Sequence, residues 1–206
     1  MDATNIKLVD IGNTHAKIYE NGKIKYVKSN DFFLDERFFY ISVNQKLNKK
    51  LEKFENAINL EKYINIKSNY KGLGVDRKIL CSYIDDGVIV DAGSAVTVDI
   101  VENRYHLGGY IYPGIAELFN SYERISPVLK VSKIDVSDIT KLPQNTQEAI
   151  NFAVIKSLVL FIKDVSKDKK IYFCGGDGKL LSSYFGNSVY EEDLIFKAMK
   201  KIIKDL

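Results

Sequence analysis

The sequence is poor in several residue types that mark particular classes of protein. It has no Trp and only three Pro, two Cys and two His in 206 residues. Cys81 and Cys174 lie far apart, and with two scattered histidines, His15 and His106, they cannot supply a zinc site unaided. We therefore expect both thiols to be reduced residues of the core, and both histidines to be structural or surface residues.

Long apolar runs and a strong charge of one sign are also absent. No stretch approaches the roughly 20 apolar residues of a membrane span, and the N-terminus has an early acid and no signal-peptide pattern. The formal net charge is +3, and most of the 30 basic residues are Lys, whereas Arg is the better sign of base or phosphate recognition. These features predict a cytoplasmic protein with no membrane and no nucleic acid as partner.

The remaining composition is that of an ordinary globular protein. Hydrophobic residues make up 46% and charged residues 28%, with 13 Tyr and 11 Phe, which excludes disordered and collagen-like chains. An Asn21-Gly22 pair between two alternating segments is a strong sign of a tight hairpin. The patterning predicts strands at 6–11, 15–20, 23–27, 38–43, 57–60, within 87–101, at 105–112 and at 170–173. It predicts helices at 44–57, 75–84, 114–125, 145–167 and 191–204, and a loop at 63–74.

Two segments share one pattern. LVDIGNTHAKIYE, from Leu8, and IVDAGSAVTVDIV, from Ile89, each read apolar–apolar–Asp–x–Gly–small polar. In both, an apolar strand runs into a glycine turn and an alternating strand follows. The repeat predicts two duplicated halves that face each other.

The first turn has the makeup of a phosphate-binding loop. Gly12 lets a ligand approach the backbone, and the amides and hydroxyl of Asn13 and Thr14 can donate to an anion. Asp10 would repel a bare phosphate, so a bridging cation is expected, and Mg²⁺ takes one or two carboxylates with waters and phosphate oxygens. Lys17 offers a further positive charge. The alternative is an ordinary hairpin with a capped turn.

The second turn, from Asp91 to Ala95, repeats this logic. Asp91 follows an apolar strand, so its carboxylate must be paired, hydrogen-bonded or metal-bound to stay ionised. Two such turns opposed across a cleft would form a nucleotide clamp. The glycine-rich loop at 175–178, a weak signal alone, offers a third place where backbone can approach a ligand.

A third motif, Gly72 to Arg77, begins the helix predicted at 75–84. Asp76 falls in its first turn, where the helix dipole favours a carboxylate. Arg77 could orient an anionic group or pair on the surface. The spacing is not a dinucleotide fingerprint, which would require Gly at position 77. The alternative is a capped helix with an acid at its start.

The residue patterns of two predicted helices indicate which of their faces are covered and which are solvated. The 145–167 helix is apolar nearly all round between Ala153 and Ile162, so it must be covered on more than one face, and a partner subunit is a natural cover. The last helix has a solvated face formed by Lys197, Lys200, Lys201 and Lys204.

Taken in order, these motifs resemble those of type III pantothenate kinases. The set is DIGNT (10–14), GVDR (74–77), DAGSAVTVD (91–99), GGYIYPG (108–114), NT (145–146) and GGDG (175–178), and it covers almost the whole chain. The resemblance implies an α/β fold like those of actin, hexokinase and acetate kinase, with two duplicated ribonuclease-H-like halves around a nucleotide cleft. The halves would be 1–84, with the phosphate turn 10–14 and a substrate loop 70–77, and 85–206, with a dimer helix 145–167.

The resemblance also implies a reaction, the ATP-dependent phosphorylation of pantothenate to 4'-phosphopantothenate, the first step of coenzyme A biosynthesis. Asp76 would be the general base, and Asp91 would hold a monovalent cation, K⁺ or NH₄⁺. ATP would be bound by Asp10 (which also holds Mg²⁺ through water), Ile11, Gly12, Asn13, Thr14, His15, Ala16, Lys17 and Ser94. Pantothenate would be bound by Tyr70, Gly74, Val75, Asp76, Arg77 and Thr146, the last from the neighbouring subunit of a homodimer.

The sequence departs from the family pattern at a few positions. Ser94 stands where the family usually has Thr, which keeps the hydroxyl. Phe152 and Ala153 stand where the family tends to place glycines, so the dimer packing is expected to differ. Tyr70 lies closer to the GVDR motif than the family's substrate tyrosine, and the chain is shorter than most relatives.

Two other functions stay open at this point. One is a related small-molecule kinase or phosphohydrolase of the same fold. The other is a catalytically weak, nucleotide-binding regulatory accessory protein. Intact Asp10, Asp76 and Asp91 favour the kinase, because a pure binder has little use for three carboxylates around a phosphate.

Overall fold

The computed structural model describes residues 6–206, which form two compact units. The first unit comprises residues 6–85, 103–106 and 193–206, and the second comprises 86–102 and 107–192. Each unit is built on its own sheet, and each is described by itself below.

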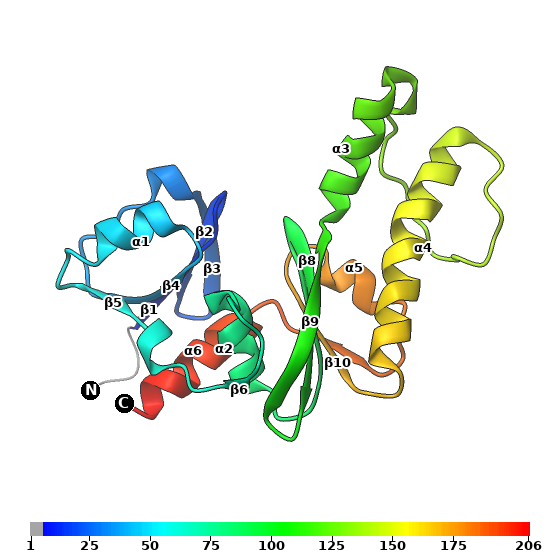
Figure 1. Cartoon of the computed structure of the whole chain (residues 1–206). Coiled ribbons are helices and arrows are strands. Elements are labelled where there is room, and N and C mark those ends of the chain that lie inside the picture. The colour runs from blue at the N-terminus through cyan, green and yellow to red at the C-terminus, as the bar shows by residue number, and fades with distance from the viewer. Residues whose placement is uncertain (1–5) are drawn as a thin grey trace. The chain divides into compact units, whose positions relative to one another are not determined.

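The sheet of the first unit has five strands in the order β3-β2-β1-β4-β5 (Figure 1). They are β1 (Lys7–Ile11), β2 (His15–Glu20), β3 (Lys23–Lys28), β4 (Phe38–Ser42) and β5 (Ala57–Asn59). β1, β2 and β3 are antiparallel, whereas β4 runs parallel to β1 and β5 parallel to β4. Asn21 and Gly22 have φ of 49° and 79°, so the tight hairpin predicted from this pair is confirmed.

The two faces of this sheet are covered by different helices. On one face, Leu47 of α1 (Gln45–Leu51) packs against the cluster that holds Val9 and Tyr40. On the other, Tyr19 stacks on Phe196 of α6 (Leu194–Lys204), with ring centroids 5.1 Å apart.

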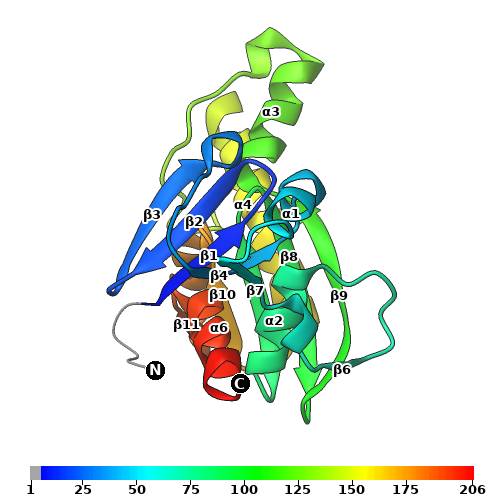
Figure 2. The same ribbon diagram turned by 90° about the vertical axis from the view of Figure 1, so that its left-hand side faces the viewer.

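The second of these faces is the one that carries Asp10. Tyr19 is the cross-strand partner of Leu8, so both point to the side of α6, and α2 (Val75–Tyr83) packs against α6, as both views show (Figure 2). Successive residues of a strand alternate between faces, so Asp10 shares the face of Leu8. It therefore lies at the carboxyl end of β1, on the side of the sheet that α6 covers.

The structure corrects several predicted boundaries in the first unit. The helix expected at 44–57 covers only Gln45–Leu51; its start is fixed by Asn44, whose side chain accepts a hydrogen bond from Leu47 N. The loop expected at 63–74 contains the short strand β6 (Lys67–Ser68), and a 3₁₀ turn, η2 (Glu61–Tyr63), overlaps its start. A second 3₁₀ turn, η1 (Ser29–Asp31), was not expected.

The compact units differ from the expected halves 1–84 and 85–206, because the last helix, α6, is part of the first unit. α6 packs with α2 and β1 of the first unit rather than with the second unit. The physical reason is its apolar face, which includes Phe196 and Met199, both without exposed surface. Lys200 is not merely solvated, because its ammonium donates to the Tyr19 hydroxyl at 2.8 Å.

The sheet of the second unit repeats the topology of the first. Its strands are β7 (Gly87–Ala92), β8 (Ala95–Glu102), β9 (Tyr105–Pro113), β10 (Ile171–Cys174) and β11 (Ser188–Tyr190), in the order β9-β8-β7-β10-β11. β7 and β8 are antiparallel, and β10 and β11 continue in parallel from β7. The duplication inferred from the two Asp-x-Gly motifs is therefore present in the strand order. The first two residues of β9 belong to the first unit, where they pair with β6.

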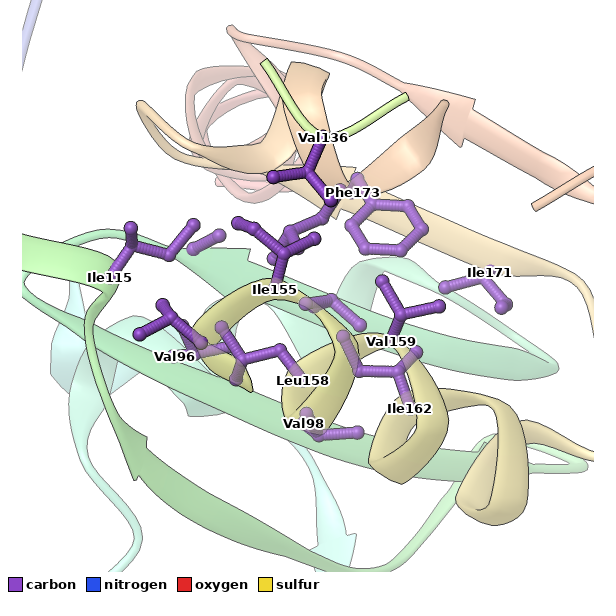
Figure 3. Packing of buried hydrophobic residues seen from close by; sticks show 14 of the residues in the cluster. Val96, Val98, Ile115, Val136, Ile155, Leu158, Val159, Ile162, Ile171 and Phe173 are labelled. Carbon is purple, nitrogen blue, oxygen red and sulfur yellow. The ribbon is translucent and has the colours of Figure 1, made fainter. Parts of the chain in front are cut away.

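The helices of the second unit pack against this sheet or against one another. They are α3 (Ile115–Ile125), α4 (Thr146–Ser166) and α5 (Gly178–Ser182), with a 3₁₀ turn, η3 (Pro127–Leu129). α5 and β11 were not predicted from the sequence. Figure 3 shows Ile155, Leu158 and Ile162 of α4 packed among side chains of the sheet such as Val98 and Phe173. One face of α4 is thus covered within the unit, while Leu160 on another side is 50% exposed.

Two further expectations can be compared with the fold. Cys81 and Cys174 are both buried, as predicted. Within residues 6–206, no helix combines the length and the apolar character that a membrane crossing requires.

Candidate functional site

The turn between β1 and β2 presents polar groups at its surface. Asn13, Thr14 and His15 are exposed, and the turn closes with a hydrogen bond of 3.0 Å from Gly12 N to His15 O. A Cβ added at Gly12 would lie 3.0 Å from that same carbonyl oxygen, so a larger residue would crowd the turn. The arrangement suits a loop whose main chain approaches an anion.

Two other residues expected to bind ATP lie in the core. The side chains of Ile11 and Ala16 have no exposed surface and belong to a buried cluster of the first unit. Any contact of theirs with a nucleotide would have to be made by the main chain.

A charged pair stands directly behind this turn. Asp10 and Lys17 are cross-strand partners, and Lys17 Nζ lies 3.3 Å from Asp10 Oδ2. Both side chains are only partly exposed, at 12% for Asp10 and 27% for Lys17. A carboxylate and an ammonium group are therefore held together at the foot of the turn, where each can act on a bound phosphate or its cation.

Ser29 stabilises the same turn by two hydrogen bonds, and the sequence did not predict this role. Its hydroxyl donates to Gly12 O at 2.8 Å and its amide to Thr14 O at 3.0 Å, and the residue is only 1% exposed. Nothing in the local sequence marks Ser29, because its contact is made across the β2–β3 hairpin.

Asp76 lies in the first turn of α2, as predicted. Its Oδ1 accepts a hydrogen bond of 2.8 Å from the main-chain N–H of Arg77, and the N-cap residue Gly74 has no side chain to compete. The positive end of the helix dipole stabilises a carboxylate at this position. Val75, in contrast, has its side chain buried at 4% exposure.

The structure brings Tyr70 and Arg77 together. The guanidinium carbon of Arg77 lies 4.7 Å from the centroid of the Tyr70 ring. Arg77 is 4% exposed and Tyr70 37% exposed, so a buried cation is covered by a ring that solvent can still reach. This contact brings Tyr70 next to the GVDR motif in space, although its spacing from that motif in the sequence is short.

The second unit has its own glycine-lined turn, between β7 and β8. Asp91 pairs with Thr97 across the hairpin and with Cys174 of β10. Ser94 is exposed at the tip. Thr97 therefore stands in the second unit where Lys17 stands in the first, so the two halves differ in charge at this position.

Two glycines from distant parts of the chain close around this turn. Gly114 donates to Ser94 O at 3.1 Å, and a Cβ added there would come within 2.5 Å of the carbonyl oxygens of Gly93 and Ser94. A Cβ added at Gly175 would come within 2.5 Å of Asp91 Oδ1 and of Ala92 O. Gly114 of the GGYIYPG motif and Gly175 of the GGDG motif are thus required by close packing around the second turn.

The chemistry of Asp91 tests whether a monovalent cation fits here. Asp91 lies partly exposed near the end of β7, and it offers carboxylate oxygens next to the carbonyl groups of the turn. Oxygen ligands of this kind are those that K⁺ accepts in proteins. The carboxylate of Asp91 is therefore compatible with such an ion, and that of Asp10 is compatible with Mg²⁺ bound through water.

Thr146 is the first residue of α4 and is exposed. Its position is set by a cap, in which Asn145 Oδ1 accepts from Glu148 N and Glu148 Oε2 accepts from Gln144 N, both at 2.9 Å. The reciprocal bonds make this helix start a well-defined place for a hydroxyl group.

Comparison with known proteins agrees with these motifs. A sequence model described as type III pantothenate kinase matches residues 36–168. A relative from Campylobacter jejuni named type III pantothenate kinase is 45% identical over 202 residues, which is 96% of each chain.

Solved structures show similarity at two levels. A Campylobacter jejuni protein described as a "conserved putative Baf family transcriptional activator" is 43% identical and has a TM-score of 0.88 over 97% of this chain and 98% of its own. A Sinorhizobium meliloti protein described as a "putative 2-dehydro-3-deoxygalactonokinase" has a TM-score of 0.60 over 98% of this chain and 96% of its own. At 8% identity, this second similarity shows the fold alone.

Proposed function

The chain belongs to the type III pantothenate kinase family and is a kinase of pantothenate, and we propose that Asp76 is the general base of this reaction. In the reaction, the γ-phosphoryl group of ATP passes to the primary hydroxyl of pantothenate. The new O–P bond forms as the bond from the γ-phosphorus to the bridging oxygen breaks, and ADP leaves. The hydroxyl proton goes to Asp76.

The observation that carries this proposal is the way the Asp76 carboxylate is held. The Arg77 N–H and the helix N-terminus fix its position and favour its ionised form. An ionised carboxylate in a fixed position is what proton abstraction from an alcohol requires. Tyr70, Gly74 and Arg77 surround this part of the chain, which supports their role in binding pantothenate.

The two glycine turns are proposed to bind ATP. Phosphoryl transfer needs mainly positioning and charge stabilisation, because the transition state spreads charge over the equatorial oxygens. Lys17 and the main-chain amides of Asn13 and Thr14 would act on the phosphates, with Ser94 contacting the nucleotide from the second turn. When bound, Mg²⁺ would neutralise phosphate charge at Asp10, and K⁺ or NH₄⁺ would do so at Asp91.

A homodimer is part of the same proposal. Thr146 would complete the pantothenate site of the neighbouring subunit, and the exposed Leu160 on α4 supports a covered surface there. Sedimentation of the purified protein tests this directly, since a monomer at all concentrations would contradict it.

A regulatory role without catalysis is less well supported. The word "activator" describes the Campylobacter jejuni protein of known structure, while the relative named a kinase matches over 96% of the chain. The chain keeps Asp10, Asp76 and Asp91, which a nucleotide sensor would not need.

The Asp76→Asn variant tests the general-base proposal. The amide keeps the size of the side chain but cannot take a proton, so kcat should fall by at least about a hundredfold while ATP still binds. Asp35→Asn, which alters an exposed carboxylate elsewhere in the first unit, is the matched control and should keep normal kcat. Near-normal turnover by Asp76→Asn would remove Asp76 from this role.

A further inference from the structure

A serine–histidine pair, with the histidine buried and the serine partly exposed, lies beside the substrate loop. Ser68, in β6, and His106, in β9, are partners in a parallel register. Ser68 Oγ lies 2.7 Å from His106 Nδ1, and His106 has no exposed surface. The proposed reaction uses neither residue, and both belong to the first unit.

The pair is connected to Tyr70 in two ways. Ser68 Oγ accepts a hydrogen bond of 3.0 Å from the main-chain N–H of Tyr70. The ring of His106 also packs against the ring of Tyr70, with centroids 5.8 Å apart and an interplanar angle of 51°. The main chain and the side chain of Tyr70 are thus both held by the same serine–histidine pair.

Tyr70 needs such support because of where it lies. Residues 69–74 form neither a helix nor a strand, and Gly72 has a φ of 73°. A loop of this kind loses conformational entropy when one geometry is fixed. Tyr70 must nevertheless stay over the Arg77 guanidinium, 4.7 Å away, while 37% of its own surface remains exposed.

The position of the Tyr70 ring affects the orientation of the Arg77 guanidinium. A ring over the face of a guanidinium stabilises it by a cation–π interaction, and the N–H donors of Arg77 lie in the guanidinium plane. Moving the ring would therefore change both the orientation of Arg77 and the surface that Tyr70 offers.

We propose that Ser68 and His106 are positioning residues for pantothenate, which act by fixing Tyr70 over Arg77. The inference rests on the proposed function, since Tyr70 and Arg77 bind substrate in that proposal. His106 supplies the buried anchor, and Ser68 links it to the backbone of Tyr70. The consequence is a pantothenate site that is formed before the substrate arrives.

Ser68→Ala is the first test, because it removes the link and leaves the imidazole in the core. The KM for pantothenate should rise by about three- to tenfold, the effect of losing one or two hydrogen bonds, while kcat and the KM for ATP stay unchanged. Ser68→Thr keeps the hydroxyl and should restore the pantothenate KM. Ser82→Ala is the matched control, because the Ser82 hydroxyl donates to Ile79 O of the same helix; this variant should change neither KM.

A double-mutant cycle with Tyr70→Ala tests whether Ser68 acts through Tyr70. If it does, Ser68→Ala should have no further effect on the pantothenate KM once the Tyr70 ring is gone. Thermal unfolding of each variant shows that the protein is folded.

Three outcomes would overturn the proposal. They are an unchanged pantothenate KM in Ser68→Ala, an equal rise in both KM values, and a full effect that persists in the Tyr70→Ala background. A wild-type protein without pantothenate-dependent turnover would instead refute the proposed function, and the inference with it. Active wild-type enzyme with an insensitive Ser68→Ala variant refutes the inference alone.

Discussion

Gly74→Ala should displace the proposed general base without unfolding the protein. A Cβ built at Gly74 would lie 2.6 Å from Asp76 Oδ1, and the atom it meets is the far end of a side chain rather than backbone. Gly74 has φ −62° and ψ 150°, which Ala adopts without strain. The clash is therefore relieved by movement of the Asp76 carboxylate, which has to shift by 0.8 Å to reach the 3.4 Å at which ordinary van der Waals contact begins.

A displacement of this size is large for catalysis and small for folding. Misplacement of a reacting group by about 1 Å can cost on the order of a hundredfold in rate, so we expect kcat to fall between about tenfold and a hundredfold. Replacing Gly by Ala at an N-cap costs less than about 1 kcal/mol, so Tm should fall only slightly.

Steady-state kinetics and thermal unfolding measure the two effects separately. Gly186→Ala is the matched control, because an added Cβ meets nothing within 4 Å there and φ is not positive; both kcat and Tm should stay at their wild-type values. A Gly74→Ala variant with normal kcat would show that the rate does not depend on where the Asp76 carboxylate lies.

Four further predictions address other parts of the account. Lys17→Met removes the ammonium beside Asp10 and should raise the KM for ATP while the KM for pantothenate is unchanged; equal effects on both would contradict the assignment. Asp91→Asn should abolish the preference of the activity for K⁺ over Na⁺, which rate measurements in the two salts check. Asn145→Ala removes the cap of α4 and should cost roughly 1 kcal/mol of stability, measured by urea unfolding. Burial, and to a smaller extent the charge of Glu52, raises the pKa of Tyr40 to about 12. The stabilisation from its neutral phenol should therefore be complete below pH 10 and be lost as the pH rises through 12. The difference in tyrosinate absorbance between the wild type and Tyr40→Phe measures this titration.

Local signals in the sequence predicted most of the strands and turns. The Asn21-Gly22 hairpin and the repeated Asp-x-Gly turns depend on residues close in sequence, and the structure has both. The repeat also predicted the duplicated strand order. The short elements β6, β11 and α5 have two, three and five residues, which is too few for a periodic pattern to emerge.

Long-range packing explains what the sequence did not predict. The membership of α6 in the first unit depends on Phe196 stacking against Tyr19, a contact between opposite ends of the chain. The helix expected at 44–57 ends at Leu51, and Ala57, at the end of that range, instead pairs with Phe38 in the sheet.

In the candidate site, too, local motifs predicted some residues, and long-range contacts account for those that were not predicted. The motifs identified Asp10, Asp76 and Asp91, because each lies at a strand or helix end with a glycine nearby. They did not identify Ser29 or the pairing of Ser68 with His106, since these contacts join segments that are far apart in the chain.

The decisive measurement is ATP consumption with and without pantothenate in the presence of Mg²⁺, with K⁺ and Na⁺ compared as the monovalent salt. Turnover should require pantothenate, yield one ADP for each 4'-phosphopantothenate formed, and be supported by K⁺ and not by Na⁺. ATP left untouched at millimolar concentration, or consumed equally without pantothenate, would contradict this expectation.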